Sequence, residues 1–207
     1  MAETITIQEP KIARFLFNTQ QGAWIWLVAR LYLGYQWLHA GWGKITGTEG
    51  GTFAWHFGFT KDSWFRSSAG LKGFAGYALT NTKGPNAAVN YGWYARFLHY
   101  IATGGGWMAP FIAVGETVIG IALIVGLFTA VAAFFGGMLN VSFGLAGVAG
   151  VNPVFFVIEV FLILAWRNAG YYGLDRYVLP AVGTPWHKGK LFEPHVPVVP
   201  TVSVVPV

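Results

Sequence analysis

Long uninterrupted apolar stretches dominate the pattern of hydrophobic and polar positions along the chain. Four of them, at about 22–44, 110–128, 129–148 and 152–167, are candidates to cross a bilayer. Backbone groups in lipid need hydrogen-bond partners within their own segment, which favours helices, and runs this continuous lack the alternation of a membrane β-strand. The pattern therefore predicts an all-α integral membrane protein built as a four-transmembrane-helix bundle.

A long connection separates the first two apolar stretches. Residues 45–109 are rich in Trp, Phe and Tyr, and the segments FRSSAGLKGFAGYAL and YGWYARFLHYIA within them predict short helices at the membrane interface. We expect a long aromatic, partly helical loop that caps the bundle. Residues 1–180 then form one membrane domain, and residues 181–207 an extended Pro-rich tail.

The composition agrees with a lipid environment. Of 207 residues, 55% are hydrophobic and only 10% are charged, whereas about 25% are charged in a soluble domain. The absence of Cys excludes disulfides, thiolate metal sites and iron–sulfur clusters in this chain. With four crossings both termini share one side, and the basic residues that flank the bundle predict cytoplasmic termini of a multi-pass protein in the cell membrane.

One face of the first span carries both charged and small residues. Arg30, Gly34, Trp37, Gly41 and Lys44 are separated by four, three, four and three positions, so they form one stripe along a helix. Glycines on this stripe would let a neighbouring backbone approach closely. Arg30 would then face protein, and Lys44 could reach the lipid headgroups.

Ionisable groups inside the spans predict a buried polar cluster, because a charge at the bilayer centre costs ~3 kcal/mol or more. Counted by depth, Glu116 and Glu159 lie within reach of the Arg30 side chain, with Asn140 nearby on a face of small residues. Two acids beside one base would leave one acid able to hold a proton, as a proton relay requires. The alternative is that these charges only hold the helices in register.

Cations near the long loop suggest an anion site. Arg96 and His99 are three residues apart and precede the glycines that open the second span. Together with Lys44 and the N–H groups of the helix start, they could bind a small anion. A solvated basic loop, or a contact with lipid headgroups, explains the same charges.

The remaining motifs exclude several functions. His39 is the only His in the four spans, so we expect neither a bis-histidine haem nor a metal site, and we interpret His39 as a hydrogen-bonded structural residue. The segment GWGKITG lacks the spacing of a phosphate-binding loop. Neither a nucleophile–base triad nor a nucleic-acid-binding module is recognisable.

Three segments together resemble the DoxX/DoxD family of membrane proteins: RLYLGYQWLHAGWGKI, GETVIGIALIVGLFTAVAAFFGGMLN and NAGYYGLDRYVLP. Together these segments span the chain from about Gly22 to Pro180. The resemblance implies a small four-helix membrane protein. For the DoxD branch it implies the large subunit of a thiosulfate:quinone oxidoreductase, which converts thiosulfate to tetrathionate, reduces quinone, and works with a smaller DoxA subunit.

We therefore expect a membrane subunit of a thiosulfate dehydrogenase that uses quinone as acceptor. Arg30 would hydrogen-bond a quinone carbonyl, and Glu116 and Glu159 would deliver protons. Side chains of the first and third spans would complete the quinone pocket: Trp37, His39 and Asn140. The small sulfur anion would bind to Lys44, Arg96 and His99.

The expected partners are membrane lipid, quinone, the sulfur anion and a DoxA-like subunit, in an oligomer that does not bind nucleic acid. A non-catalytic scaffold or accessory subunit of a larger redox complex is the main alternative. A transporter is the third reading, although no inverted repeat is visible.

Overall fold

The computed structural model describes residues 9–48, 55, 57–80, 82, 87, 89–148 and 150–183, and every regular element in these ranges is a helix. The predicted helical class is therefore confirmed for the described chain. The α-helices are α1 (Lys11–Asn18), α2 (Ala23–Thr46), α3 (Ala69–Leu79), α4 (Gly92–Thr103), α5 (Met108–Val125), α6 (Thr129–Leu145), α7 (Asn152–Leu164) and α8 (Asp175–Val178). Short 3-10 turns are η1 (Gln20–Gly22), η2 (Gly105–Trp107) and η3 (Leu179–Val182).

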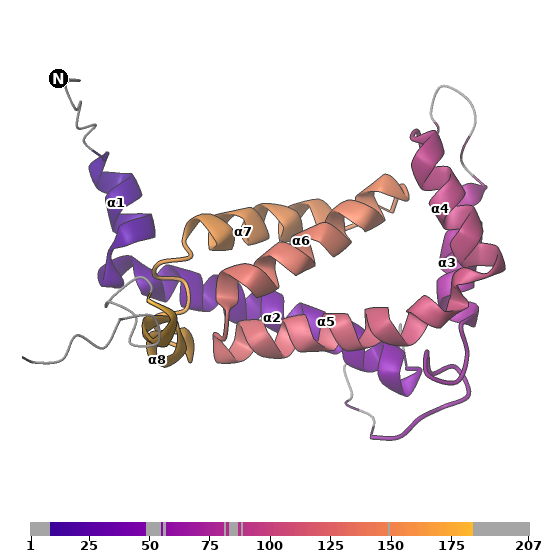
Figure 1. Ribbon diagram of the computed structural model, residues 1–207, viewed down its shortest axis with the longest axis horizontal. Helices are drawn as coiled ribbons and strands as arrows, with labels where there is room; N and C mark the ends of the chain where they lie inside the picture. Colours follow the sequence, from indigo (N-terminus) through magenta and orange to yellow (C-terminus); the bar gives the residue numbers. More distant parts are fainter. Residues whose placement is uncertain are drawn as a thin grey trace, which may run out of the picture.

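Helices α2, α5, α6 and α7 correspond to the four predicted spans and form the bundle. Helices α2 and α5 run antiparallel along the long axis of the molecule, and α6 and α7 form a hairpin that packs on them (Figure 1). By length and apolar composition, one membrane span is identified within the described ranges, Gly105–Val125. Helices α6 and α7 are apolar but shorter.

Glycines bring the backbones of α2 and α5 into contact, as the stripe on the first span predicted. A Cβ at Gly34 would lie 2.9 Å from the carbonyl oxygen of Gly120, and one at Gly41 would lie 2.5 Å from the backbone nitrogen of Thr117. A Cβ at Gly120 would in turn strike the backbone of Leu38. No larger side chain fits at these positions. The two helices can therefore pack closely at only one position relative to each other along their axes, which we call their axial offset.

The long connection folds into a cap over one end of the bundle (Figure 1). Both helices predicted there are present, as α3 and α4, and they pack on each other around Leu71, Ala75 and Leu98. The Tyr94 hydroxyl of α4 donates to the carbonyl oxygen of Ser142 in α6 at 2.5 Å. Burial raises the pKa of Tyr94, which keeps its phenol a donor that ties the cap to α6.

At the opposite end, α1 and the segment after α7 close the bundle. The indole N–H of Trp26 in α2 donates to the carbonyl oxygen of Leu16 at 2.6 Å. The Asn168 amide donates to the same oxygen at 2.8 Å and to the carbonyl oxygen of Thr19 at 2.7 Å. Most of the predicted tail, residues 184–207, lies outside the described residues.

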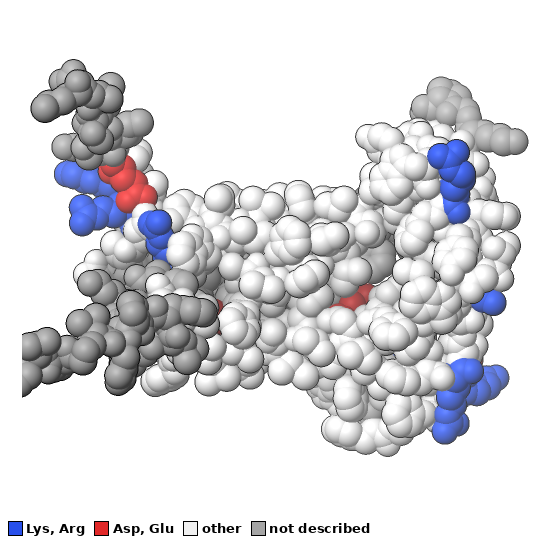
Figure 2. Space-filling view, viewed as in Figure 1, with Lys and Arg blue, Asp and Glu red and all other residues white. Residues whose placement is uncertain are grey.

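The outside of the bundle is apolar and its inside holds charge. Large exposed side chains cover the outer faces of three helices: Phe111, Val118 and Ile121 of α5, Phe134, Phe135 and Met138 of α6, and Val154, Val157 and Leu164 of α7. Figure 2 shows Lys and Arg at the two ends of the face in view, with an almost uncharged stretch between them. Arg30, Glu116 and Glu159 are each at most 1% exposed.

Candidate functional site

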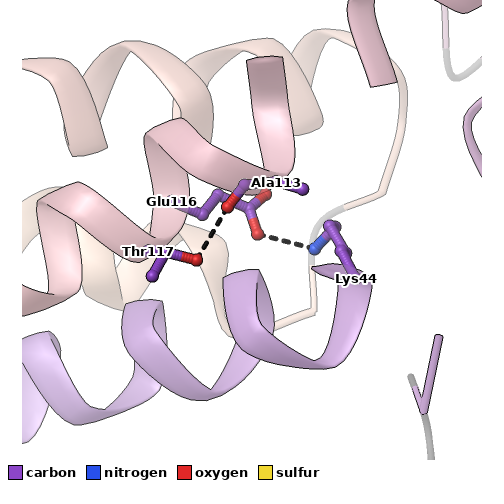
Figure 3. Close-up of polar contacts among 4 residues, drawn as sticks. All are labelled: Lys44, Ala113, Glu116 and Thr117. Carbon is purple, nitrogen blue, oxygen red and sulfur yellow. Dashed lines mark hydrogen bonds and ion pairs between the residues drawn. The ribbon is translucent and has the colours of Figure 1, made fainter. Parts of the chain in front are cut away.

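Lys44 and Glu116 form a buried ion pair where the end of α2 lies against α5. Lys44 Nζ lies 2.7 Å from Glu116 Oε2, and the two side chains are 12% and 1% exposed. Figure 3 shows the Glu116 carboxylate reaching across from α5 to the last turn of α2. Gly41, one turn before Lys44, permits this close approach. The prediction that Lys44 reaches lipid headgroups is therefore wrong, because its charge is neutralised within the bundle.

Glu159 of α7 is the centre of a second buried polar group. Its Oε1 accepts the indole N–H of Trp37 at 2.9 Å, and its Oε2 accepts the amide N–H of Asn140 at 2.8 Å. Gly136 leaves the necessary space, because a Cβ there would lie 2.5 Å from Oε1. Asn140 therefore lies beside an acid, as predicted.

A pocket of about 480 Å³ connects the two polar groups, and we call it the Lys44 pocket. Its lining includes Lys44 and Glu116 from the ion pair, and Trp37 and Asn140 from the second group. Most other lining residues are apolar or aromatic, such as Trp64, Leu71, Phe74, Ile112, Phe143 and Phe155. A volume of roughly 300–1,000 Å³ with few convergent polar groups is typical of a small-molecule site.

Asn140, a lining residue, has an amide oxygen that is buried and unsatisfied within the described residues. The Asn140 side chain is 3% exposed, and its Oδ1 accepts no hydrogen bond from any residue that the structure describes. A buried acceptor left unsatisfied costs about 1–3 kcal/mol.

His39 lines the same pocket from α2, in the company of other rings. Its imidazole is stacked on Tyr35, with centroids 6.0 Å apart, and lies edge-on to Trp55 at the same distance. Gln36 also lines the pocket. The flat faces of Tyr35 and Trp55 beside His39 suit a ring ligand.

Arg30 does not join the predicted cluster. Its Nη1 donates to the carbonyl oxygens of Leu123 and Ile124 at 2.7 Å each, and its Nη2 donates to the carbonyl oxygen of Tyr172 at 2.6 Å. These are the free carbonyls at the end of α5 and in the segment after α7. The prediction of one buried cluster of Arg30, Glu116 and Glu159 is therefore wrong, and the guanidinium instead closes a helix end.

The reason is the axial offset of the antiparallel helices. Arg30 lies fourteen residues before Lys44 in α2, about 21 Å along the helix. Because Gly34 meets Gly120, the arginine lies level with the last turn of α5, and Lys44 lies level with Glu116. The sequence-based prediction estimated the depth of each residue along its own helix, so it did not include the offset between the two helices.

The three side chains predicted to bind the anion lie in different surroundings. Arg96 and His99 are exposed on α4, whereas the Lys44 ammonium is paired inside the bundle. The predicted helix start between the cap and α5 is η2, a 3-10 turn of three residues. Within the described residues, no three His, Cys, Asp or Glu side chains are grouped so that they could hold a metal ion.

Asp175 is a buried acid that the sequence patterns did not single out. Its Oδ1 and Oδ2 accept the backbone N–H groups of Phe128 and Thr129, at 2.5 and 2.9 Å, and so cap the start of α6. The Asp175 N–H donates to the carbonyl oxygen of Gly126 at 2.7 Å. A cap that comes from 46 residues away leaves no local spacing signal.

Comparison of the chain with protein-family models, with curated proteins and with solved structures finds no match.

Proposed function

We propose that the chain is a four-span membrane subunit of a quinone-linked oxidoreductase and that the Lys44 pocket is its quinone site. The observation that carries this proposal is the pocket itself. The paired side chains of Lys44 and Glu116 lie together with the Asn140 amide in a lining that is otherwise mostly apolar. The resemblance to DoxX/DoxD proteins points to the same class.

The distribution of apolar and charged side chains supports the membrane part of the proposal. Apolar residues face outward on α5, α6 and α7, and buried ionisable groups face inward, the reverse of a soluble bundle and typical of lipid exposure. Lys and Arg gather at the two ends of the face shown in Figure 2. Helix α2, with 24 residues, is about 36 Å long and exceeds the ~30 Å hydrocarbon core.

The side chains of the Lys44 pocket suit the chemistry of a quinone. Lys44 can donate a hydrogen bond to a ring oxygen and stabilise the negative charge that develops there during reduction. Glu116, beside it, can hold a proton or pass one on. Trp37, His39 and Trp64 provide flat faces for the ring. In this arrangement the proton-handling groups are Lys44 and Glu116, and Arg30 has no part in catalysis.

The electron donor follows from the resemblance, which indicates thiosulfate. Two thiosulfate dianions give up one electron each and join through a new S–S bond as tetrathionate. The two electrons, with two protons, convert quinone to quinol. Arg96 and His99 remain our candidates for attracting the dianion, because they give the exposed side of α4 a basic character. A DoxA-like subunit would complete the path for the electrons.

Quinone binding tests this proposal directly. We expect a short-chain ubiquinone to quench the tryptophan fluorescence of the detergent-purified protein in a saturable way. Replacement Lys44→Met should weaken binding at least about tenfold, since a hydrogen bond from a charged donor contributes about 1.5–3 kcal/mol. Lys61→Met, at an exposed position, should bind like the wild type.

Two outcomes would contradict the proposal: a wild-type protein that does not bind the quinone, or a Lys44→Met protein that binds it normally. Because the single change leaves Glu116 buried without its Lys44 partner, a double variant, Lys44→Met with Glu116→Gln, removes both charges and repeats the test. Thiosulfate-dependent quinol formation, followed by absorbance, then tests the electron donor.

The contacts of Arg30 favour one alternative, a non-catalytic scaffold. Its hydrogen bonds within the described residues go to backbone carbonyls, as expected of a group that holds helices together. A scaffold would purify with a tightly bound redox partner and would show neither quinone binding nor turnover. The binding experiment above separates the two functions.

A further inference from the structure

Helix α1 turns away from the bundle instead of extending α2. Figure 1 shows α1 standing out to the side of the axis of α2. The turn η1 between the two helices is tight, since a Cβ at Gly22 would strike the carbonyl group of Phe15. The carbonyl oxygen of Leu16 accepts hydrogen bonds from the side chains of Trp26 and Asn168, at 2.6 and 2.8 Å. Contacts with α2 and with the segment after α7 therefore fix the direction of α1.

Three kinds of side chain divide the surface of α1. At 3.6 residues per turn, Lys11 and Arg14 share one side of the helix. Ile12 and Phe15 lie on a second side and are 76% and 38% exposed. The third side, with Phe17, packs on the core of the bundle. Within the folded chain, α1 thus presents both a basic side and an apolar side to its surroundings.

The surroundings of α1 carry a net positive charge. Lys11 and Arg14 are exposed, and Arg167, also exposed, donates to the Asn18 side-chain oxygen at 2.8 Å. The exposed acid Glu9, which accepts a hydrogen bond from Asn18, offsets one of the three cations. Figure 2 shows Lys or Arg side chains on the side of α1 that faces away from the bundle. This surface is complementary in charge to an anion.

The direction of α1 relates these two sides to the proposed membrane. The spans run along the long axis of the molecule (Figure 1), so a helix that stands out to the side lies along the bilayer surface. A helix in that position buries its apolar side chains among the acyl chains and keeps its cations at the headgroups. Ile12 and Phe15 would then be covered by lipid, whereas in water both would remain uncovered.

We infer that α1 is an interfacial helix whose basic side binds the headgroups of anionic phospholipids. The inference rests on the membrane part of the proposed function and adds a lipid-binding surface outside the Lys44 pocket. The apolar side provides contact with any lipid, and the cations select an anionic one. We expect about fivefold enrichment of an anionic lipid beside α1, which corresponds to about 1 kcal/mol, the contribution of one Lys or Arg near a charged membrane surface.

Fluorescence quenching by labelled lipids tests both sides of the helix. The full-length Ile12→Cys protein carries a bimane label, which replaces a side chain that is 76% exposed. It is reconstituted into phosphatidylcholine vesicles that contain a small, equal fraction of nitroxide-labelled phosphatidylglycerol or phosphatidylcholine. We expect both lipids to quench the label, the anionic one about fivefold more effectively. Added NaCl should reduce the difference, because it screens the charges.

Two charge variants of the labelled protein identify the cations responsible. Lys11→Gln combined with Arg14→Gln should abolish the preference for phosphatidylglycerol, because Glu9 then offsets the remaining Arg167. Lys61→Gln combined with Arg66→Gln removes two exposed cations from the segment before α3, so it is the matched control and should keep the preference.

Each contrary result has its own meaning. A label that neither lipid quenches, in a protein that resists extraction from the vesicles by carbonate, overturns the inference while membrane insertion stands. Equal quenching by the two lipids, or a preference that survives Lys11→Gln with Arg14→Gln, overturns the binding of anionic headgroups. A protein that does not insert overturns the membrane part of the proposed function and the inference with it. Should labelled Ile12→Cys not fold, a label at Phe15→Cys on the same side repeats the test.

Discussion

Arg30 illustrates how a buried charge can serve structure alone. An arginine has five donors in a planar fork, and here the two terminal nitrogens reach three carbonyl oxygens that no helix can satisfy. Gly126 follows α5 with φ of 67°, and a Cβ there would lie 2.8 Å from the Arg30 guanidinium carbon. Glycine is thus required at this position by both backbone conformation and space.

Replacement Arg30→Met should lower the stability of the protein without loss of quinone affinity in the folded fraction. The three carbonyls would lose their donors, at a total cost of about 2–5 kcal/mol. Thermal unfolding in detergent measures the loss, and Arg167→Met, at an exposed position, is the control. A stable Arg30→Met protein with weakened quinone binding would restore the catalytic role that the sequence suggested.

For the candidate site, the sequence predicted correctly which residues are buried, but it predicted less well which residues contact one another. Arg30, Glu116, Asn140 and Glu159 are all inside the bundle, as the cost of exposing polar groups to lipid required. All three charged residues lack the partners predicted for them, since Arg30 bonds carbonyls, Glu116 pairs with Lys44, and Glu159 bonds Trp37. Only the position of Asn140 beside an acid agrees with the prediction. Burial follows from residue type, but pairing depends on the offset between helices.

At the scale of helices, the glycine contact between α2 and α5 determines that offset. Gly34 and Gly41 on α2 and Gly120 on α5 interlock, and this brings Lys44 level with Glu116. The helix-forming segments themselves were predicted to within a few residues. The last three spans each end three residues earlier than predicted, α7 for example at Leu164 instead of residue 167.

Two glycines of α5 provide a matched test of this contact. Gly120→Ala should destabilise the protein by about 1–3 kcal/mol, because its Cβ meets the Leu38 backbone. Gly115→Ala, where nothing lies within 4 Å of the new Cβ, should be neutral or stabilising, since Ala favours a helix by up to about 1 kcal/mol over Gly. Equal effects on thermal unfolding would show that the contact does not hold the helices together.

For the whole molecule, the positions of the two ends give the proposed orientation. Helices α1 and α8 lie at one end of the long axis and the cap at the other (Figure 1). The proposed four crossings would place α1 and α8 on one side of the membrane, and the flanking basic residues favour the cytoplasm. The cap would then face outward.

The chain has no Cys, so a single introduced cysteine can be labelled to test this topology without any labelling of native cysteines. In intact cells a membrane-impermeant maleimide should label Arg66→Cys in the segment before α3 and not Arg14→Cys in α1, and permeabilisation should expose both. Phe134→Cys, on the outer face of α6, should stay unlabelled while the membrane is intact. Labelling of Arg14→Cys and Arg66→Cys from the same side would contradict a four-span bundle.

The sequence by itself determined the helices, the cap helices and the inward position of the polar residues. Each of these depends on local periodicity or on the cost of exposing a polar group to lipid. Both follow from the residue types and from their order along the chain. The tertiary structure alone decided that Lys44 pairs with Glu116, that Arg30 closes α5, and that Asp175 caps α6. These pairings join residues 46 to 142 positions apart. They depend on which helix faces meet and at what axial offset, and both are determined by the close packing of the helix backbones.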